Sequence, residues 1–210
     1  MSTEIRQIII RHAEEGLRLR KDFFATQAKN LEDCAQRIAL AVANGRKLLI
    51  CGNGGSAADA QHLAGEFVNR FLLDRPPLPA FALTTDSSVL TAISNDFGFE
   101  HVFAKQIYAL GVPGDVLLAL STSGKSPNVL AALRAAREKN MHSIGLSGAG
   151  HGMDALCDIV LHVPHASTPL IQEIHISACH LICALVDHLL FKDAAMTILS
   201  GLHGDAASKN

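Results

Sequence analysis

Residues 51–67 read CGNGGSAADAQHLAGEF and continue the apolar run at 47–51. The apolar run predicts a buried strand, the glycines after it predict a tight turn, and the residues from Ser56 onward predict a helix that begins at its cap. Unpaired backbone N–H groups and the helix dipole favour an anion at such a helix N-terminus. The stretch therefore predicts a strand, turn and helix with a phosphate site at the turn.

Two ionisable residues of this predicted helix lie one turn apart on the same face. His62 and Glu66 stand at positions i and i+4, a spacing that brings two side chains together. Such a pair, taken alone, is more often a surface pair than a functional one. Its place just past a glycine turn, together with His180 on a later predicted helix, favours a metal-binding or proton-transfer role.

Short apolar runs alternate with helical patterns over the rest of the chain. This alternation predicts an α/β fold, in which helices cover both faces of a parallel sheet. The predicted strands are 47–51, 80–85, 115–121, 143–147 and 159–163. The predicted helices are two within 3–44, then 57–70, 87–94, 100–110, 128–139, a short one near 153–157, and a long last helix at 170–191.

The composition predicts one compact domain without a nucleic-acid or membrane partner. The 210 residues are 49% hydrophobic with a net charge of −2, and no run of Lys and Arg indicates a nucleic-acid-binding surface. We expect no apolar stretch of about 20 residues that would form a membrane span. The amphipathic pattern of the first residues is unlike a signal peptide. We therefore expect a cytoplasmic protein with one domain at 1–193 and a flexible tail at 194–210. Five cysteines without a CxxC pair predict reduced core thiols.

A second loop resembles the first in character. The sequence STSGKS at 121–126 leaves a predicted strand and precedes a helix with Pro127 near its first position. Hydroxyls and free N–H groups can hold a phosphate without a formal charge, and neither a Walker A loop nor a GxGxxG motif is present. Because open α/β sheets bind ligands at the carboxyl ends of their strands, two such loops predict one shared anion site.

Four motifs, taken in order, resemble a known family. CGNGGS at 51–56, SNDFGFE at 94–100, STSGKS at 121–126 and IQEIH at 171–175 resemble the sugar isomerase (SIS) domain, and more closely the phosphoheptose isomerases. The resemblance implies a flavodoxin-like five-stranded parallel sheet with helices on both faces, an N-terminal helical pair and a long C-terminal helix. It also implies a homotetramer with active sites at subunit interfaces.

The resemblance implies an aldose–ketose isomerase that converts D-sedoheptulose 7-phosphate to D-glycero-D-manno-heptose 7-phosphate through an enediol. This is the first step of ADP- or GDP-heptose biosynthesis, which leads to bacterial lipopolysaccharide. Such a reaction needs two proton carriers, and the matching residues are Glu66 at carbon and His180 at the oxygens. The resemblance further implies one zinc ion per subunit, with the ligands His62, Glu66, Gln172 and His180.

The substrate-binding positions are likewise implied by the resemblance. Phosphate would be held by hydroxyls and by the glycine turn, and Asn95 and Asp96 match positions that contact the sugar. The matching phosphate residues are Asn53, Gly54, Gly55, Ser56, Ser121, Thr122, Ser123 and Ser126, and Glu66 and Gln172 also match substrate contacts.

Two questions about the site stay open at this point. At about 100° per residue, Gln172 and His180 differ by about 80° around a helix, whereas Glu173 and His180 differ by only about 20°. Helix spacing alone would therefore select Glu173, which we interpret as an interface or cap residue. Whether zinc takes part in the chemistry or only organises the site is also undecided. His175, on the other side of its helix, is interpreted as an interface histidine.

Two other functions compete with heptose isomerisation. An SIS-domain adaptor that binds the bacterial replication initiator shares the GNGGSAA and AQH sequences with this chain. Such an adaptor needs no general base, so Glu66 together with His180 favours an enzyme. The second rival is an SIS isomerase of a hexose or pentose phosphate, which the NDFGFE and IQEIH sequences disfavour.

Overall fold

The computed structural model describes residues 3–191, which fold around one parallel five-stranded sheet in the order β2-β1-β3-β4-β5. This is the flavodoxin-like order, which reverses between β1 and β3. The predicted α/β class and the parallel sheet are thus confirmed. The strands are β1 (Leu48–Gly52), β2 (Ala80–Ala82), β3 (Val116–Ser121), β4 (His142–Ser147) and β5 (Ile159–His162).

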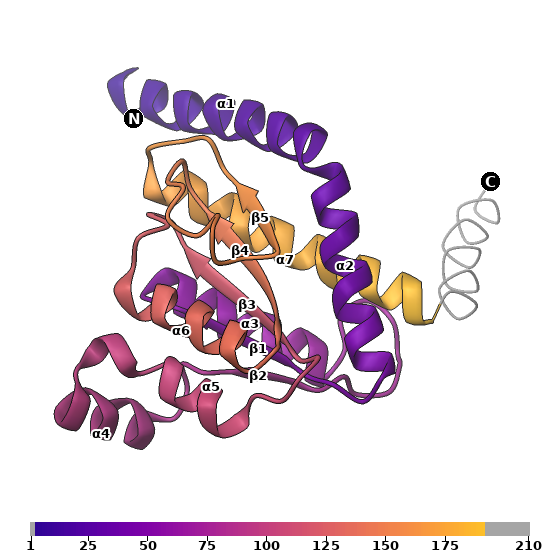
Figure 1. Ribbon diagram of the computed structural model, residues 1–210. Coiled ribbons are helices and arrows are strands. Elements are labelled where there is room, and N and C mark those ends of the chain that lie inside the picture. The colour runs from indigo at the N-terminus through magenta and orange to yellow at the C-terminus, as the bar shows by residue number, and fades with distance from the viewer. Residues whose placement is uncertain (1–2, 192–210) are drawn as a thin grey trace.

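Helices pack on both faces of the sheet (Figure 1). One core lies between the sheet and α2, α3 and α7, and the other lies between the sheet and α5 and α6. Successive β1 side chains alternate between the two cores, which is why the whole strand is apolar. The helices are α1 (Thr3–Thr26), α2 (Ala28–Ala43), α3 (Gly55–Val68), α4 (Ser87–Phe97), α5 (Ala104–Leu110), α6 (Pro127–Glu138) and α7 (Thr168–Leu190), with a 3₁₀ turn η1 (Phe99–His101).

Two predicted elements differ from the structure. The short helix predicted near 153–157 is wrong, because these residues form only turns in which the N–H groups of Leu156 and Cys157 both donate to the Met153 carbonyl. The turn lies within the 11-residue connection 148–158 between β4 and β5, and it does not extend into a helix. Strand β2 ends at Ala82, and a turn then leads to Asp86, whose carboxylate caps α4 through Val89 N at 3.0 Å.

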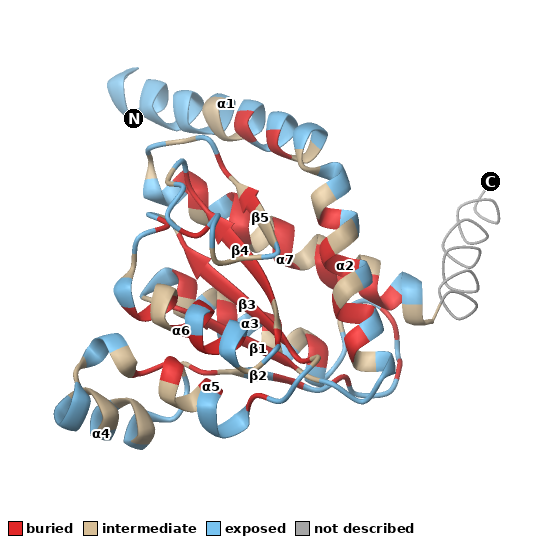
Figure 2. Cartoon of the chain, viewed as in Figure 1, coloured by how far each residue is buried: buried red, intermediate tan, exposed pale blue. Residues whose placement is uncertain are grey.

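Helix α7 is the most apolar long element of the described residues. It is long and apolar enough, by length and composition, to cross a membrane, with a mean hydropathy of 1.5 over 18 residues. Our sequence expectation that no such stretch exists was wrong in this respect. Half of that window is buried inside the fold, however, and α7 lies among the other elements in Figure 2. Burial against α2 and α3 therefore accounts for its hydrophobicity.

The N-terminal pair of helices is only partly covered by the fold. Helix α2 buries six residues, whereas the 24-residue α1 buries only Leu19 and Phe23. Every residue of α1 from Thr3 to Glu14 is exposed, as the pale-blue start of α1 in Figure 2 shows. The flexible tail predicted at 194–210 lies outside the described residues, so the domain boundary at 193 stays a prediction. The five cysteines are free, as predicted, and four of them are buried.

Candidate active site

The turn between β1 and α3 depends on glycine at three positions. Gly54 adopts φ 55° at the N-cap of α3, a region that L side chains rarely enter. A Cβ on Gly52 would lie only 2.7 Å from the Ser56 carbonyl oxygen, and a Cβ on Gly55 would collide with the amide of Gln172. No side chain of the described residues caps α3. The first N–H groups of this helix can therefore serve an anion.

Asn53 is held by a residue that sequence reasoning missed. The side-chain amides of Asn53 and Asn128 exchange two hydrogen bonds of 2.8 Å each, and Asn128 Oδ1 also accepts a bond from the N–H of Val129 at 3.0 Å. Asn128 is buried in the first turn of α6. It ties the turn after β1 to the helix after β3. The one available signal was an amide directly after Ser126 and Pro127.

The second predicted loop, residues 121–126, is called the hydroxyl loop below. It lies beside this turn because β1 and β3 are neighbours, with Gly52 opposite Leu120. Ser121 Oγ is 3.0 Å from Ser126 Oγ and 3.4 Å from Ser123 Oγ, so three hydroxyls gather at one point. Gly124, with φ 65°, closes the loop by donating its N–H to the Ser121 carbonyl at 2.9 Å. The two loops together offer hydroxyls and backbone N–H groups, a donor set suited to phosphate.

A second group of polar side chains brings α3 and α7 together. His62 Nε2 lies 2.8 Å from His180 Nε2 and 3.3 Å from Glu66 Oε1. The three ligand atoms all lie within 4.8 Å of one another, a grouping that could hold a metal ion. Imidazole nitrogens and a carboxylate oxygen are donors that zinc prefers. The predicted pairing of the His62–Glu66 face with His180 is present in the structure.

The surroundings of this cluster fix its orientation while leaving it open to solvent. The Phe71 ring stacks on His180, with centroids 5.5 Å apart and planes 22° apart. The side chain of His62 is 47% exposed and that of Glu66 is 21% exposed. A hollow of about 340 Å³ adjoins His180 and is also lined by Arg20 and Phe24. A small polar molecule can therefore reach the cluster from outside.

Gln172 and Glu173 occupy different places on α7. The Gln172 amide lies against Gly55 of the glycine turn, about 12 Å along the helix axis from His180 by helix geometry. Glu173, which spacing alone selected, points to α1 and pairs with His12 Nε2 at 3.2 Å. The interpretation of Glu173 as an interface or cap residue stays a prediction. Gln172 also stays a predicted metal ligand, but its amide lies at the glycine turn and not beside His180.

The sequence matches the SIS domain family over residues 11–148. It is 59% identical, over 194 residues, to the phosphoheptose isomerase of Nitratidesulfovibrio vulgaris, and the match covers 92% of this chain and 93% of the relative. The chain belongs to the phosphoheptose isomerase family.

Solved structures of family members have the same fold. The phosphoheptose isomerase of Neisseria gonorrhoeae superposes with a TM-score of 0.82 at 43% identity, covering 87% of this chain and 98% of that one. That of Francisella tularensis superposes with a TM-score of 0.84 at 35% identity, covering 90% and 100%. The SIS fold of this member of the phosphoheptose isomerase family is thus shown by sequence and by structure.

Three residues that the sequence singled out in this phosphoheptose isomerase family member, Asn95, Asp96 and His175, lie apart from the two polar groups. Asn95 donates its amide N–H to Asp96 Oδ1 at 2.8 Å, and both side chains are exposed on α4, a helix without buried residues. His175 is fully buried within the chain, so its interpretation as an interface histidine was wrong. The apolar residues around it on α7 conceal it among the core.

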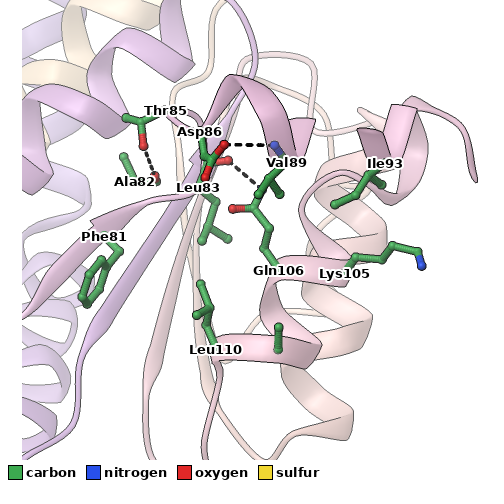
Figure 3. A pocket seen from close by; sticks show the side chains of 11 residues that line it. Phe81, Ala82, Leu83, Thr85, Asp86, Val89, Ile93, Lys105, Gln106 and Leu110 are labelled. Atoms are coloured by element: carbon green, nitrogen blue, oxygen red, sulfur yellow. Dashed lines mark hydrogen bonds between the residues drawn. The ribbon is translucent and has the colours of Figure 1, made fainter. Parts of the chain in front are cut away.

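A separate apolar pocket of about 430 Å³ lies at the β2 edge of the sheet, between α4 and α5 (Figure 3). Phe81, Leu83 and Ile93 line it, and Asp86 and Lys105 stand at its margin. None of the predicted site residues lines this pocket. Its apolar walls do not suit a phosphosugar, so we place the candidate active site at the two polar groups instead.

Proposed function

We propose that this protein is an isomerase that interconverts D-sedoheptulose 7-phosphate and D-glycero-D-manno-heptose 7-phosphate. Membership of the phosphoheptose isomerase family carries this proposal. The arrangement of two polar groups supports it, because one group suits a phosphate and the other offers proton carriers. Gly55 and His62 stand seven residues apart on α3, which is roughly 10 Å along a helix. An extended seven-carbon phosphosugar can bridge the two groups.

The phosphate would bind between the glycine turn and the hydroxyl loop. The backbone of Asn53, Gly54 and Gly55 contributes N–H groups at the N-terminus of α3, where the helix dipole favours negative charge. The Ser121–Ser123–Ser126 hydroxyl group supplies further donors from the neighbouring strand end. Ser56 and Thr122 complete the proposed set, and the Gln172 amide closes the turn over Gly55.

Isomerisation moves one proton between adjacent carbons and another between their oxygens. We assign Glu66 as the base that takes the proton from carbon and returns it to the neighbouring carbon. His180, whose Nε2 is 2.8 Å from that of His62, would carry the proton between the two oxygens. Each proton removed is returned, so the substrate is neither oxidised nor reduced overall.

The His62, Glu66 and His180 donors fit a zinc ion, whereas Gln172, the predicted fourth ligand, lies beside Gly55 and about 12 Å along α7 from His180, so it does not complete this group within one chain. The fit rests on two imidazole nitrogens and a carboxylate oxygen that face one another. When bound, zinc supplies Lewis-acid polarisation of the sugar oxygens. Elemental analysis of gently purified protein should find one zinc at this site per chain, and loss of activity on chelation should be reversed by zinc.

A homotetramer in the cytoplasm completes the proposal. Support comes from exposed apolar side chains on α1, including Ile8 at 51%, Ile9 at 54% and Leu17 at 71% exposure. Exposed Asn95 and Asp96 on the protruding α4 are, in this proposal, contributed to the active site of another subunit. The initiator-binding adaptor has no support among the relatives, which are isomerases.

The deciding experiment incubates the purified protein with sedoheptulose 7-phosphate and follows formation of the aldoheptose phosphate. Wild type should be active, and Glu66→Gln and His180→Gln should each lower kcat by about 10²- to 10⁴-fold, the usual worth of a proton carrier. Glu173→Gln is the matched control, since this carboxylate pairs with His12 on the surface, and it should keep nearly full activity.

Three outcomes would count against parts of the proposal. Full activity in Glu66→Gln would remove the base. Higher kcat/KM with a hexose or pentose phosphate would replace the substrate. An inactive wild type that binds a replication initiator protein would replace the enzyme with the adaptor.

A further inference from the structure

A second cluster of metal-ligand side chains lies outside the candidate active site. His151 Nδ1 is 2.8 Å from Asp154 Oδ2, and Asp154 Oδ1 is 3.0 Å from His162 Nε2. The three ligand atoms lie within 4.8 Å of one another. His151 and Asp154 belong to the loop after β4, whereas His162 is the last residue of β5. The loop and the strand therefore meet at one carboxylate.

The orientation of His162 directs its Nε2 to the Asp154 carboxylate. Its Nδ1 lies 3.3 Å from the Gly148 carbonyl oxygen, which can only accept, so Nδ1 carries the proton. Nε2 faces Asp154 Oδ1 at 3.0 Å and can coordinate an ion when the ion displaces its proton. A backbone carbonyl that fixes the tautomer in this way is the usual support of a zinc-bound histidine.

The chemistry of the cluster selects one class of ion. Two imidazole nitrogens and one carboxylate oxygen form a three-ligand set that suits zinc and leaves its fourth position to water. Calcium and magnesium prefer sites built from oxygen ligands. The side chains are 74%, 44% and 25% exposed at His151, Asp154 and His162, so an ion can enter from solvent.

The loop that carries His151 rests directly on the hydroxyl loop 121–126. Gly148 N donates to the Thr122 carbonyl at 3.1 Å, and a Cβ on Gly148, Gly150 or Gly152 would collide with a backbone carbonyl of residues 122–124. The backbones of the two loops are thus in contact. An ion that fastens the 148–154 loop to β5 would also hold the 121–126 loop from behind.

We propose that His151, Asp154 and His162 form a second zinc site, separate from the His62 cluster, which braces the 148–154 loop against the 121–126 loop. The bound ion replaces the hydrogen bonds that now join Asp154 to the two imidazoles. The site is separate from the proposed proton carriers Glu66 and His180, and it takes no part in the isomerisation.

The test is a zinc titration by calorimetry on metal-free full-length protein that carries His62→Ala and His180→Ala. These changes remove the first cluster, so the result does not depend on the proposed function. The protein should bind one zinc per chain and gain thermal stability on zinc addition. Adding His151→Gln and His162→Gln should abolish both effects. Adding His101→Gln, at a half-exposed histidine that pairs with Glu100, should leave both unchanged.

A milder variant and an ion control sharpen the result. Asp154→Asn, which retains the shape of the side chain, should weaken zinc binding at least about tenfold, as expected for loss of a charged ligand or its support. Calcium should not bind. Absence of zinc binding in the His62→Ala/His180→Ala protein would overturn the proposal, as would binding that persists without His151 and His162. Circular dichroism of each variant confirms that the fold is retained.

Discussion

Asn128 shows at the scale of one residue how the turn of the predicted phosphate site is held. It is buried, accepts one hydrogen bond from Asn53 and donates another to it, and so positions the glycine turn. An amide pair of this kind fixes both residues, because a buried amide without a partner costs about 1–3 kcal/mol.

We expect Asn128→Ala to raise KM for the phosphosugar about tenfold and to leave kcat within a few-fold, because the turn loses its tether while Glu66 and His180 keep their places. The check is steady-state kinetics beside Asn44→Ala, whose amide bonds only its own helix at the Leu40 carbonyl. Asn128→Asp should bind the substrate more weakly still, since a carboxylate beside the turn repels phosphate. Unchanged KM in both variants would contradict the tether.

Burial of His175 makes the stability of the folded protein depend on pH. Burial lowers the pKa of His175 from 6.5 to about 4, against a smaller opposing effect of the Ser147 backbone. Between pH 6.5 and 4 the unfolded chain binds a proton at His175 that the folded chain does not. Stability is therefore full above pH 6.5 and falls as pH drops through this window, by about 3 kcal/mol in total.

Urea unfolding of wild type and His175→Gln at several pH values from 7 to 4 checks this expectation. The variant has no titrating ring, so its stability should fall less steeply, by about the amount that His175 contributes. Parallel curves for the two proteins would contradict the assignment.

At the scale of elements, a buried ion pair fastens α3 to α7. Arg75 Nε donates to Asp187 Oδ1 at 2.8 Å, and its other nitrogens donate to the carbonyls of Phe67 at 2.7 Å and Glu66 at 3.0 Å. Both charged side chains are almost fully buried. The pair thus holds the end of α3 that carries Glu66 against the helix that carries His180.

We expect Asp187→Asn to destabilise the protein by about 3–5 kcal/mol, because it leaves the Arg75 charge buried without its partner. The measurement is the free energy of unfolding in urea. Asp33→Asn is the matched control, since the Lys29–Asp33 pair is largely exposed, and it should cost less than about 1 kcal/mol. Equal losses in the two variants would contradict the role of burial.

At the scale of the whole molecule, α1 carries an apolar stripe that extends beyond the part of the fold on which α1 packs. Ile8 and Ile9 lie on the same side of α1 as the buried Leu19 and Phe23, by helix spacing. The fold covers the second half of this stripe and leaves the first half exposed. A second copy of the chain is the partner that the proposed tetramer supplies for it.

Ile8→Asp combined with Ile9→Asp should shift the protein from about four times the 22.3 kDa of one chain toward smaller species, because charges replace apolar contacts. Light scattering after size-exclusion chromatography measures the mass. Lys21→Asp places the same side chain on the face of α1 opposite the stripe of Ile8, Ile9, Leu19 and Phe23, and should leave the mass unchanged. A wild-type protein that is already monomeric would refute the tetramer.

Much of the fold could be predicted because local patterns carry it. The five strands, the N-terminal helical pair and α7 follow from apolar runs and helical spacing. The two proposed anion-binding loops follow from glycine or hydroxyl residues at strand ends. The turns at 153–157 were mistaken for a helix because a short apolar run has no period of its own. Asn128, Arg75 and the His151 cluster were missed, since their partners lie 75, 112 and up to 11 residues away in the chain.

The sequence by itself determined the α/β class, the two loops, the His62–Glu66 face and, through its motifs, the family. The family motifs also implied that His180 meets His62. Tertiary structure alone decided that Gln172 lies over Gly55 rather than beside His180, and that His175 is buried. The physical reason is that spacing along a helix specifies a face but not what packs on it. That choice depends on how α3 and α7 cross, and hence on contacts between residues more than a hundred positions apart in the chain.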